Sequence, residues 1–300
     1  MADRQKEIPK ALKFVFGGSA GMMATLFVQP LDLLKNRMQL SGVGTAKKEY
    51  TSSFQAFRGI IANEGVFALY NGLSAGLLRQ ATYTTTRLGV YQMLFDMASR
   101  DGHPPNFATK AAIGMAAGVC GAFVGTPAEV ALIRMTSDGR LPAAERRNYK
   151  NVVDAMMRIC REEGVLALWR GAIPTMGRAM VVNAAQLASY SQAKQVLASY
   201  DFFEEGIFLH FCASMISGLI TTAASMPVDI AKTRIQNMKY VDGKPEYTGA
   251  LDVLGKLVKN EGVFALWKGF TPYYCRLGPH TVLTFIFLEQ LNATYKRYAA

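Results

Sequence analysis

Three arginines in this 300-residue chain occupy equivalent places and could bind an anion. Arg79, Arg178 and Arg276 each come seven residues after the last glycine of a recurring run, EGVFALYNG, EGVLALWRG or EGVFALWKG. Arginine stays charged and can hold a carboxylate through two parallel hydrogen bonds. If these runs begin equivalent helices, the three guanidinium groups lie at one depth around one axis. Such a set would suit a small anion with two carboxylates.

Tyr83 and Arg87 extend this set along the first of those helices. They follow Arg79 by four and eight residues, so in a helix they share its face and reach about 12 Å along the axis. The residues around them are rich in threonine hydroxyls. An alternative interpretation of Arg87 is that its side chain extends toward lipid headgroups. We predict that the substrate-binding residues are Arg79, Tyr83, Arg87, Arg178 and Arg276.

A second set of charges follows three prolines. The runs PLDLLKNR, PAEVALIR and PVDIAKTR start at Pro30, Pro127 and Pro227. They contain the acids Asp32, Glu129 and Asp229 and the bases Lys35 and Lys232, with Leu132 at the third basic position. An unpaired charge inside a membrane costs about 2.5–3.5 kcal/mol on insertion scales, so partners on neighbouring helices are expected. For Asp32 alone, the alternative is that it only caps a helix bend.

Both sets of charges belong to a repeat of about 99 residues. The glycine-ending runs are spaced by 99 and 98 residues, and a pair of small residues precedes each proline. Each repeat predicts a long helix with small residues at its contacts and an internal proline. A polar connection follows, with a short amphipathic helix ending near Glu-Gly, and then a second long helix. The expected limits are about 8–100, 105–199 and 204–298, within a single domain, 1–300.

The composition favours a membrane protein. Half of the residues are hydrophobic, and although Lys plus Arg exceed Asp plus Glu by 33 to 22, the basic residues are not clustered as in a nucleic-acid-binding protein. Six segments are long enough to span a bilayer, near 10–39, 73–99, 107–136, 172–198, 204–236 and 271–297. Polar residues at helical spacing within them indicate wet faces around a cavity. We predict an all-α membrane protein with six transmembrane helices in three pseudo-symmetric repeats and three short helices.

The repeated PxDxxKxR and EGxxxxWxG patterns resemble the signature of mitochondrial carriers over nearly the whole chain. The resemblance implies a three-fold bundle that transports metabolites across the inner mitochondrial membrane by alternating access. The residues that it assigns to a gate on the matrix side are Asp32, Lys35, Glu129, Asp229, Lys232, Gln39 and Gln236. The family's pairing joins Glu129 to Lys232 and Asp229 to Lys35. Leu132 would leave Asp32 without its usual partner, so a complete ring is not expected.

Three runs resemble, in particular, the branch of this family that exchanges dicarboxylates such as 2-oxoglutarate and malate. They are QATYTTTR from Gln80, FVGTPAEVALIRM from Phe123 and TPYYCRLGPHTVLTFIFLEQ from Thr271. The implied partners are 2-oxoglutarate, malate and similar dicarboxylates, together with membrane lipids; no cofactor and no nucleic acid are implied. The alternative within transport is another dicarboxylate carrier or an uncoupling-type carrier.

The distribution of lysine and arginine predicts the orientation in the membrane. The long connections, about 41–71, 137–170 and 237–268, contain 3, 7 and 5 basic residues, whereas the short ones, about 100–106 and 199–206, contain 1 and 0. Connections rich in Lys and Arg lie on the cytoplasmic side of bacterial membranes, and the matrix is the compartment equivalent to the bacterial cytoplasm. The long connections should therefore face the matrix, and both termini should face the intermembrane space.

An enzyme and a membrane scaffold are the rival classes. The run GGSAG at residues 17–21 fits the GxSxG pattern of a hydrolase nucleophile elbow, which requires a preceding strand and later acid and histidine partners. A helix-like segment surrounds this run and the histidines show no triad order, so we do not expect an enzyme. A scaffold without transport would not need equivalent arginines in three helices.

Overall fold

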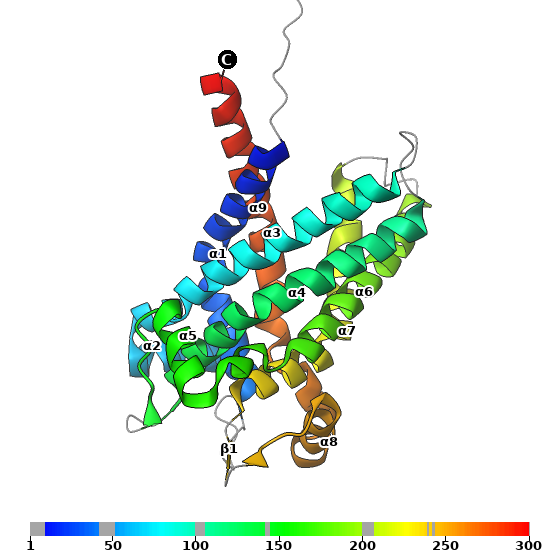
Figure 1. Ribbon diagram of the computed structural model, residues 1–300. Helices are drawn as coiled ribbons and strands as arrows, with labels where there is room; N and C mark the ends of the chain where they lie inside the picture. The colour runs from blue at the N-terminus through cyan, green and yellow to red at the C-terminus, as the bar shows by residue number, and fades with distance from the viewer. Residues whose placement is uncertain are drawn as a thin grey trace, which may run out of the picture.

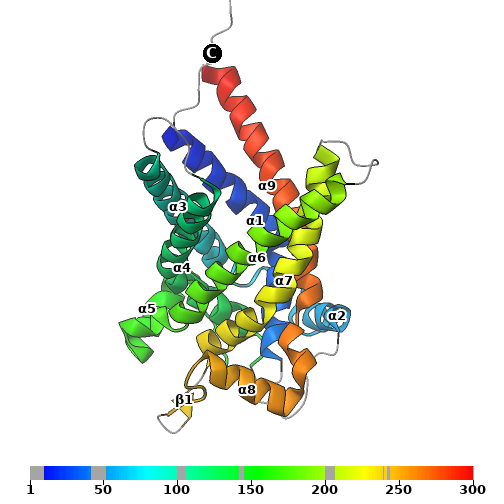
Figure 2. The same cartoon turned by 90° about the vertical axis from the view of Figure 1, so that its right-hand side faces the viewer.

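The frame of the protein is a closed ring of long helices (Figure 1 and Figure 2). The computed structural model describes residues 10–41, 52–99, 106–141, 145–199, 207–238, 240–241 and 244–299. The long helices are α1 (Lys10–Leu40), α3 (Leu73–Ala98), α4 (Phe107–Asp138), α6 (Ala172–Ala198), α7 (Ile207–Asn237) and α9 (Phe270–Ala299). Each packs against the next in chain order, and α9 returns to α1. The predicted all-α architecture is confirmed, while the repeat limits expected near 8, 100, 105 and 204 lie outside the described residues.

Three short helices gather at one end of the ring, which we call the short-helix end (Figure 1). They are α2 (Ser53–Glu64), α5 (Val152–Glu163) and α8 (Ala250–Glu261), followed by the 3-10 helices η1 (Val66–Tyr70), η3 (Val165–Trp169) and η4 (Val263–Trp267). The predicted Glu-Gly ends are confirmed. Gly65, Gly164 and Gly262 follow the short helices with φ of 84°, 87° and 85°, a backbone conformation that glycine adopts without steric cost.

Each short helix buries an apolar face against the proline-containing helix of its own repeat. The hydrophobic clusters join Ile60 of α2 with Leu33 of α1, Ile159 of α5 with Val130 of α4, and Leu257 of α8 with Ile230 of α7. These residues occupy equivalent places in the three repeats. Full burial of such a side chain contributes about 1.5–3 kcal/mol, so apolar packing attaches the short helices to the ring.

Each internal proline leaves one backbone carbonyl of its helix without a helical donor. In α7 a tryptophan side chain donates to this carbonyl. Pro30, Pro127 and Pro227 lie inside α1, α4 and α7, as predicted. Because proline has no N–H, the carbonyl four residues earlier loses its helical donor. In α7 this carbonyl belongs to Ala223, and it accepts a hydrogen bond of 3.0 Å from Nε1 of Trp267. The equivalent Trp169 has a buried Nε1 without a partner among the described residues.

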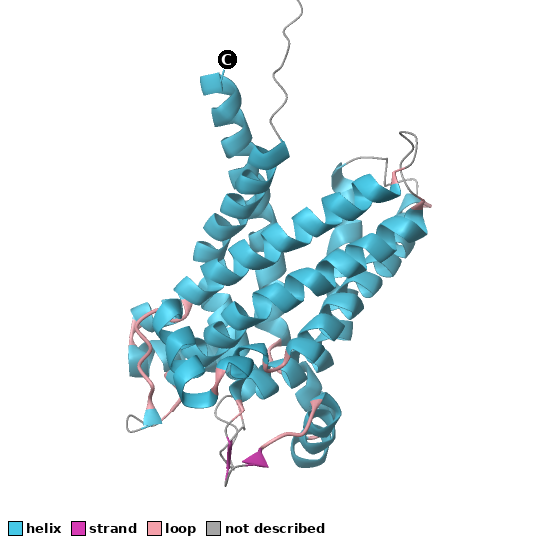
Figure 3. Cartoon of the chain, in the orientation of Figure 1, coloured by secondary structure: helices cyan, strands magenta, loops and turns pink. Residues whose placement is uncertain are grey.

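A short hairpin interrupts the helical pattern before α8 (Figure 3). The strands β1 (Tyr240–Val241) and β2 (Lys244–Pro245) pair antiparallel, two residues each. The sequence analysis did not predict them. They lie in the third long connection, outside the ring, and do not alter the all-α architecture.

The helices separate an apolar exterior from a polar axis. By length and composition alone, one described segment, Ala108–Asp138 of α4, could cross a membrane, with a mean hydropathy of 1.6. In α3, the charged residues Arg79 and Arg87 interrupt the apolar sequence and lower the hydropathy. Large apolar side chains such as Phe27 and Ile216 remain exposed on the ring. This arrangement fits helices with one lipid-facing side and one wet side.

Candidate substrate cavity and gate

The five predicted substrate-binding residues line a single cavity of about 350 Å³. Arg79, Tyr83 and Arg87 come from α3, Arg178 from α6 and Arg276 from α9. The cavity therefore requires the second long helix of every repeat. Its volume falls in the range of small-molecule sites, roughly 300–1,000 Å³. Glu129 and Lys232 line the same cavity, so the predicted substrate site and the predicted gate are contiguous.

Two of the three equivalent arginines are held by acids of the predicted gate. Arg178 donates from Nε to Oδ1 of Asp229. Nη1 of Arg276 lies 2.8 Å from Oδ1 of Asp32. Arg79 differs, because its Nε is buried without a hydrogen-bond partner among the described residues. The three arginines are equivalent by sequence, but the structure gives each of them different surroundings.

Asp32 lacks its usual partner at position 132, as expected, but it is not without a base. Leu132 offers no charge and packs in an apolar cluster with Ala75, as its residue type requires. Arg276 supplies the missing base instead, from the neighbouring helix α9. The expectation considered only bases at the lysine positions of the repeat, whereas the long arginine side chain reaches the acid from another level.

The other predicted gate residues form a buried network on the axis. Nζ of Lys35 donates to Oδ2 of Asp229 at 2.9 Å, and Nζ of Lys232 donates to Oε1 of Glu129 at 2.7 Å. The side chain of Asp229 is fully buried. Removing one member of such a pair leaves an uncompensated charge, at about 3–5 kcal/mol. We call these two pairs, together with Arg276–Asp32, the axial network; it joins α1, α4, α7 and α9.

Gln39 and Gln236 lie directly beside the axial network, and both are buried. Oε1 of Gln39 accepts a hydrogen bond of 2.8 Å from the hydroxyl of Thr233. Nε2 of Gln236 donates to the hydroxyl of Thr175 at 3.2 Å. These contacts link α1 with α7 and α7 with α6, which is the placement that bracing residues would need. Their role in the gate stays a prediction.

Tyr273 joins the arginine set to the axial network, and the sequence analysis missed it. Its hydroxyl accepts a hydrogen bond of 2.7 Å from Nη2 of Arg178, and its ring centroid lies 4.0 Å from Nζ of Lys35, a favourable position for a cation over a ring. A sequence signal existed. Tyr273 comes four residues after Gly269, and Thr175 occupies the equivalent place in the second repeat.

A further layer of ion pairs was also missed. We call it the outer ion pairs: Arg37–Glu64, Arg134–Glu163 and Arg234–Glu261. Each glutamate ends a short helix, and each arginine lies near the end of the long helix that precedes it. Nε of the three arginines also donates to carbonyls of Thr136, Gln236 and Gln39, at 3.0, 3.4 and 3.4 Å. Carbonyls at a helix end have no intrahelical donor, so each arginine ties its repeat to the next.

The outer glutamates differ in how many bases hold them. Burial by itself would raise the pKa of Glu163, but hydrogen bonds and charge from Arg134 and Arg170 lower it below the ordinary value of 4.5. Nη1 of Arg170 lies 2.6 Å from Oε2 of Glu163. In the first repeat the position of Arg170 is occupied by Asn71. Glu64 therefore lacks the second base that Arg170 supplies to Glu163.

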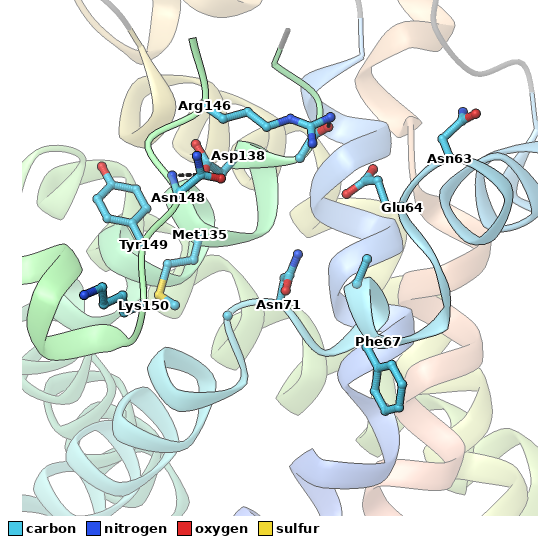
Figure 4. Close-up of a pocket in the computed structure, with 13 residues that line it drawn as sticks. Asn63, Glu64, Phe67, Asn71, Met135, Asp138, Arg146, Asn148, Tyr149 and Lys150 are labelled. Carbon is cyan, nitrogen blue, oxygen red and sulfur yellow. Dashed lines mark hydrogen bonds between the residues drawn. The ribbon is translucent and has the colours of Figure 1, made fainter. Parts of the chain in front are cut away.

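A second hollow, of about 640 Å³, lies at the short-helix end (Figure 4). Asp138 and Arg146, which line it, hydrogen-bond to the local backbone. The carboxylate of Asp138 accepts the N–H groups of Arg147 and Asn148 at 2.8 and 2.7 Å, and Nε of Arg146 donates to the carbonyl of Leu141 at 2.9 Å. The five predicted substrate residues line the other cavity. The axial cavity, despite its smaller volume, is therefore the candidate substrate site.

The GxSxG run does not have the structural context that a nucleophile elbow needs. Residues 17–21 lie inside α1, where the strand that should precede a nucleophile elbow cannot form. The described residues contain no group of three or more His, Cys, Asp and Glu side chains that could hold a metal ion. Arginines, hydroxyls and one imidazole dominate the cavity wall, which is the chemistry of anion binding.

Comparison with known proteins identifies the family. The family described as "Mitochondrial carrier protein" matches three consecutive segments, residues 6–101, 103–201 and 203–299. These segments cover nearly the whole chain. The protein belongs to the mitochondrial carrier family and is a transport protein of the mitochondrial membrane.

Individual relatives match over almost their full length. The chain is 71% identical over 290 residues to the "Mitochondrial 2-oxoglutarate/malate carrier protein" of Homo sapiens, covering 96% of this chain and 92% of the relative. It is 69% identical over 291 residues to the protein of the same name in Caenorhabditis elegans, covering 97% and 95%. It is 46% identical over 287 residues to a "Mitochondrial dicarboxylate/tricarboxylate transporter" of Arabidopsis thaliana, covering 95% and 93%.

Proposed function

We propose that this protein is an antiporter that exchanges 2-oxoglutarate for malate or related dicarboxylates across the inner mitochondrial membrane. The observation that carries the proposal is that Arg79, Arg178 and Arg276 line one cavity bounded by the axial network. The names of the relatives at about 70% identity support the same substrates. Another dicarboxylate carrier is the second candidate, favoured by the plant relative that carries a dicarboxylate/tricarboxylate name.

The ion pairs suggest how substrate binding opens the gate. Arg178 is paired with Asp229 and Arg276 with Asp32. The carboxylates of a bound dicarboxylate compete for the same guanidinium groups, and a charge-assisted hydrogen bond contributes about 1.5–3 kcal/mol. Once Arg276 binds substrate, Asp32 loses its base. The axial network is then weakened from the cavity side, and binding energy favours the open conformation.

The same contacts account for strict exchange. An empty carrier must break Lys35–Asp229 and Lys232–Glu129 without compensation, and both pairs are largely buried. A loaded carrier replaces part of this lost energy with bonds to the substrate. The protein should therefore return across the membrane quickly only when it carries a second dicarboxylate.

The orientation that we propose places the short-helix end in the matrix and both termini in the intermembrane space. The support is the excess of Lys and Arg in the long connections, 3, 7 and 5 against 1 and 0 in the short ones. The short connections at 100–105 and 200–206 lie outside the described residues. This placement can be tested with a tag at each terminus. In mitochondria whose outer membrane has been opened and whose inner membrane is intact, a protease should cleave both tags.

Reconstitution in liposomes tests the exchange. Liposomes loaded with malate should take up labelled 2-oxoglutarate much faster than liposomes loaded with chloride. Protein-free liposomes loaded with malate are the control for leakage. Equal uptake with internal malate and chloride would exclude antiport, and exchange of other dicarboxylates without 2-oxoglutarate would favour the second candidate.

A further inference from the structure

The cavity layer one helical turn beyond the arginines differs among the three repeats. Counting eleven residues from Gly72, Gly171 and Gly269 gives Tyr83, Val182 and His280. All three of these side chains line the cavity that contains the arginines. One repeat thus contributes a phenol, one an isopropyl group and one an imidazole. A substrate held at this level meets hydrogen-bonding groups on two sides and an apolar group on the third.

His280 has an unused hydrogen-bonding atom at this position. Its Nε2 is buried and has no partner among the described residues, although buried polar atoms are nearly always paired. Its imidazole interacts electrostatically with Arg276, Asp32 and Arg79. The backbone carbonyl of His280 accepts the hydroxyl of Thr284 at 2.7 Å, so the local helix is satisfied. The hydrogen-bonding capacity of Nε2 is thus left unused among the described residues.

The arginines cannot distinguish all of the dicarboxylates from one another. Malate and succinate have the same two carboxylates on four carbons, and 2-oxoglutarate and glutarate have the same two carboxylates on five. Within each pair, the members differ only in the oxygen on C2. A group that binds this oxygen must be a hydrogen-bond partner that lies near one of the carboxylate-binding arginines.

We propose that His280 binds the C2 oxygen of the substrate and thereby favours 2-oxo and 2-hydroxy dicarboxylates over unsubstituted ones. His280 follows Arg276 by four residues on α9, about 6 Å along the helix, so a carboxylate held by Arg276 places the adjacent C2 near the imidazole. A ring nitrogen can donate to a 2-oxo group and can donate to or accept from a 2-hydroxyl. Val182 of the second repeat would contact the methylene carbons of the substrate.

The burial of Nε2 links this recognition to the gate. Arg276 is paired with Asp32, and both interact electrostatically with the imidazole. A carboxylate that binds Arg276 releases Asp32 and rearranges the side chains that cover Nε2. The ring nitrogen obtains its partner in that step, so a substrate without the C2 oxygen opens the same ion pair but leaves the imidazole unbonded.

The test rests on the proposed function and uses two ratios measured in proteoliposomes by competition against labelled 2-oxoglutarate. They are the inhibition constant of succinate divided by that of malate, and the constant of glutarate divided by that of unlabelled 2-oxoglutarate. We expect both ratios to exceed one in the wild type. His280→Phe, which keeps a ring but no ring nitrogen, should lower both by about tenfold, the effect of one net hydrogen bond. His280→Gln, which keeps a donor, should retain most of the preference.

Two further variants give the result its specificity. Tyr274→Phe removes a hydroxyl from the same helix outside the cavity wall and should leave both ratios unchanged. Tyr83→Phe tests the other hydrogen-bonding group of the layer. The assignment to His280 would be overturned if both ratios were unchanged in His280→Phe, or if the preference were lost only in Tyr83→Phe. Ratios of one in the wild type would overturn it as well. If His280→Phe does not fold, His280→Asn and His280→Gln replace it. The assignment is then supported if the His280→Gln variant retains both ratios and the shorter side chain of His280→Asn lowers them. A wild type that exchanges no dicarboxylate contradicts the proposed function itself.

Discussion

The two layers of ion pairs near the short-helix end differ in symmetry. The outer ion pairs Arg37–Glu64, Arg134–Glu163 and Arg234–Glu261 repeat with the same partners in all three repeats. The axial network keeps two lysine–acid pairs, but its third acid, Asp32, is bound by an arginine of the substrate cavity. The three arginine–glutamate pairs of the outer layer follow the three-fold repeat, whereas the axial network departs from it.

The difference follows from what each layer does. The outer ion pairs attach a short helix to a long helix and bond a carbonyl of the next repeat, so the same task recurs at each repeat. The axial network borders the cavity, and a dicarboxylate with a C2 oxygen has no three-fold symmetry. Departures from a repeated pattern are expected at functional sites. The position of the departure therefore points to the substrate.

Arg178→Lys should produce the largest effect and falls on the axial side of the comparison. Lysine keeps the charge but loses the planar two-point contact, and Arg178 contacts both Asp229 and Tyr273. We expect 2-oxoglutarate exchange to fall by at least about tenfold, since a single lost charge-assisted bond accounts for that much, while the protein still inserts. Exchange kinetics in proteoliposomes measure the effect.

The matched control for Arg178→Lys is Lys259→Ala, a change on the exposed surface of α8. It should leave exchange unchanged. The assignment of the substrate site would be contradicted if each of the three single variants, Arg79→Lys, Arg178→Lys and Arg276→Lys, exchanged substrate with wild-type kinetics. That result would leave the family assignment intact.

Arg37→Gln tests the symmetry of the outer ion pairs. It leaves Glu64 without its base, and we expect unfolding to become easier by about 3 kcal/mol, as for one broken partly buried pair. Arg134→Gln should lower the free energy of unfolding by less, about 2 kcal/mol, because Arg170 still contacts Glu163. Thermal unfolding in detergent measures both. Equal losses would mean that Arg170 adds no support, and the outer layer would then be symmetric in energy as well as in geometry.

Leu132→Lys would restore the three-fold pattern of the axial network. The new base should compete with Arg276 for Asp32 and add a bond to the closed gate. We expect slower exchange and a higher melting temperature than in Leu132→Met, which has a long side chain without charge. The partly offsetting cost is that position 132 lies in an apolar cluster with Ala75. Exchange as fast as in Leu132→Met would indicate that residues 32 and 132 do not meet.

Trp267→Phe should give the smallest effect and extends the comparison to neutral groups. It removes the donor to the Ala223 carbonyl, and the expected loss is about 1 kcal/mol for one hydrogen bond. Trp169→Phe removes an indole N–H that has no partner among the described residues, so its melting temperature should change less. The reverse order in thermal unfolding would contradict the proposed role of the tryptophan at the proline.

Much of the architecture could be predicted from the sequence because it depends on local signals. Helix-ending glycines, internal prolines and apolar periodicity act within a few residues of the chain. The repeat then places equivalent residues at equivalent depth, which is why Arg79, Arg178 and Arg276 could be grouped before the structure was known. The structure confirms the ring of long helices and places these arginines in one cavity.

Other contacts were decided only by the tertiary structure. Asp32 and Arg276 come from opposite ends of the chain, and their pairing depends on the packing of α1 against α9 and on the reach of a guanidinium group. Tyr273 meets Arg178 and Lys35 for the same reason. The repeat specifies the level of each side chain, but it does not specify which of several partners at nearby levels a long side chain chooses. That choice depends on the distances across the axis, and the folded ring sets them.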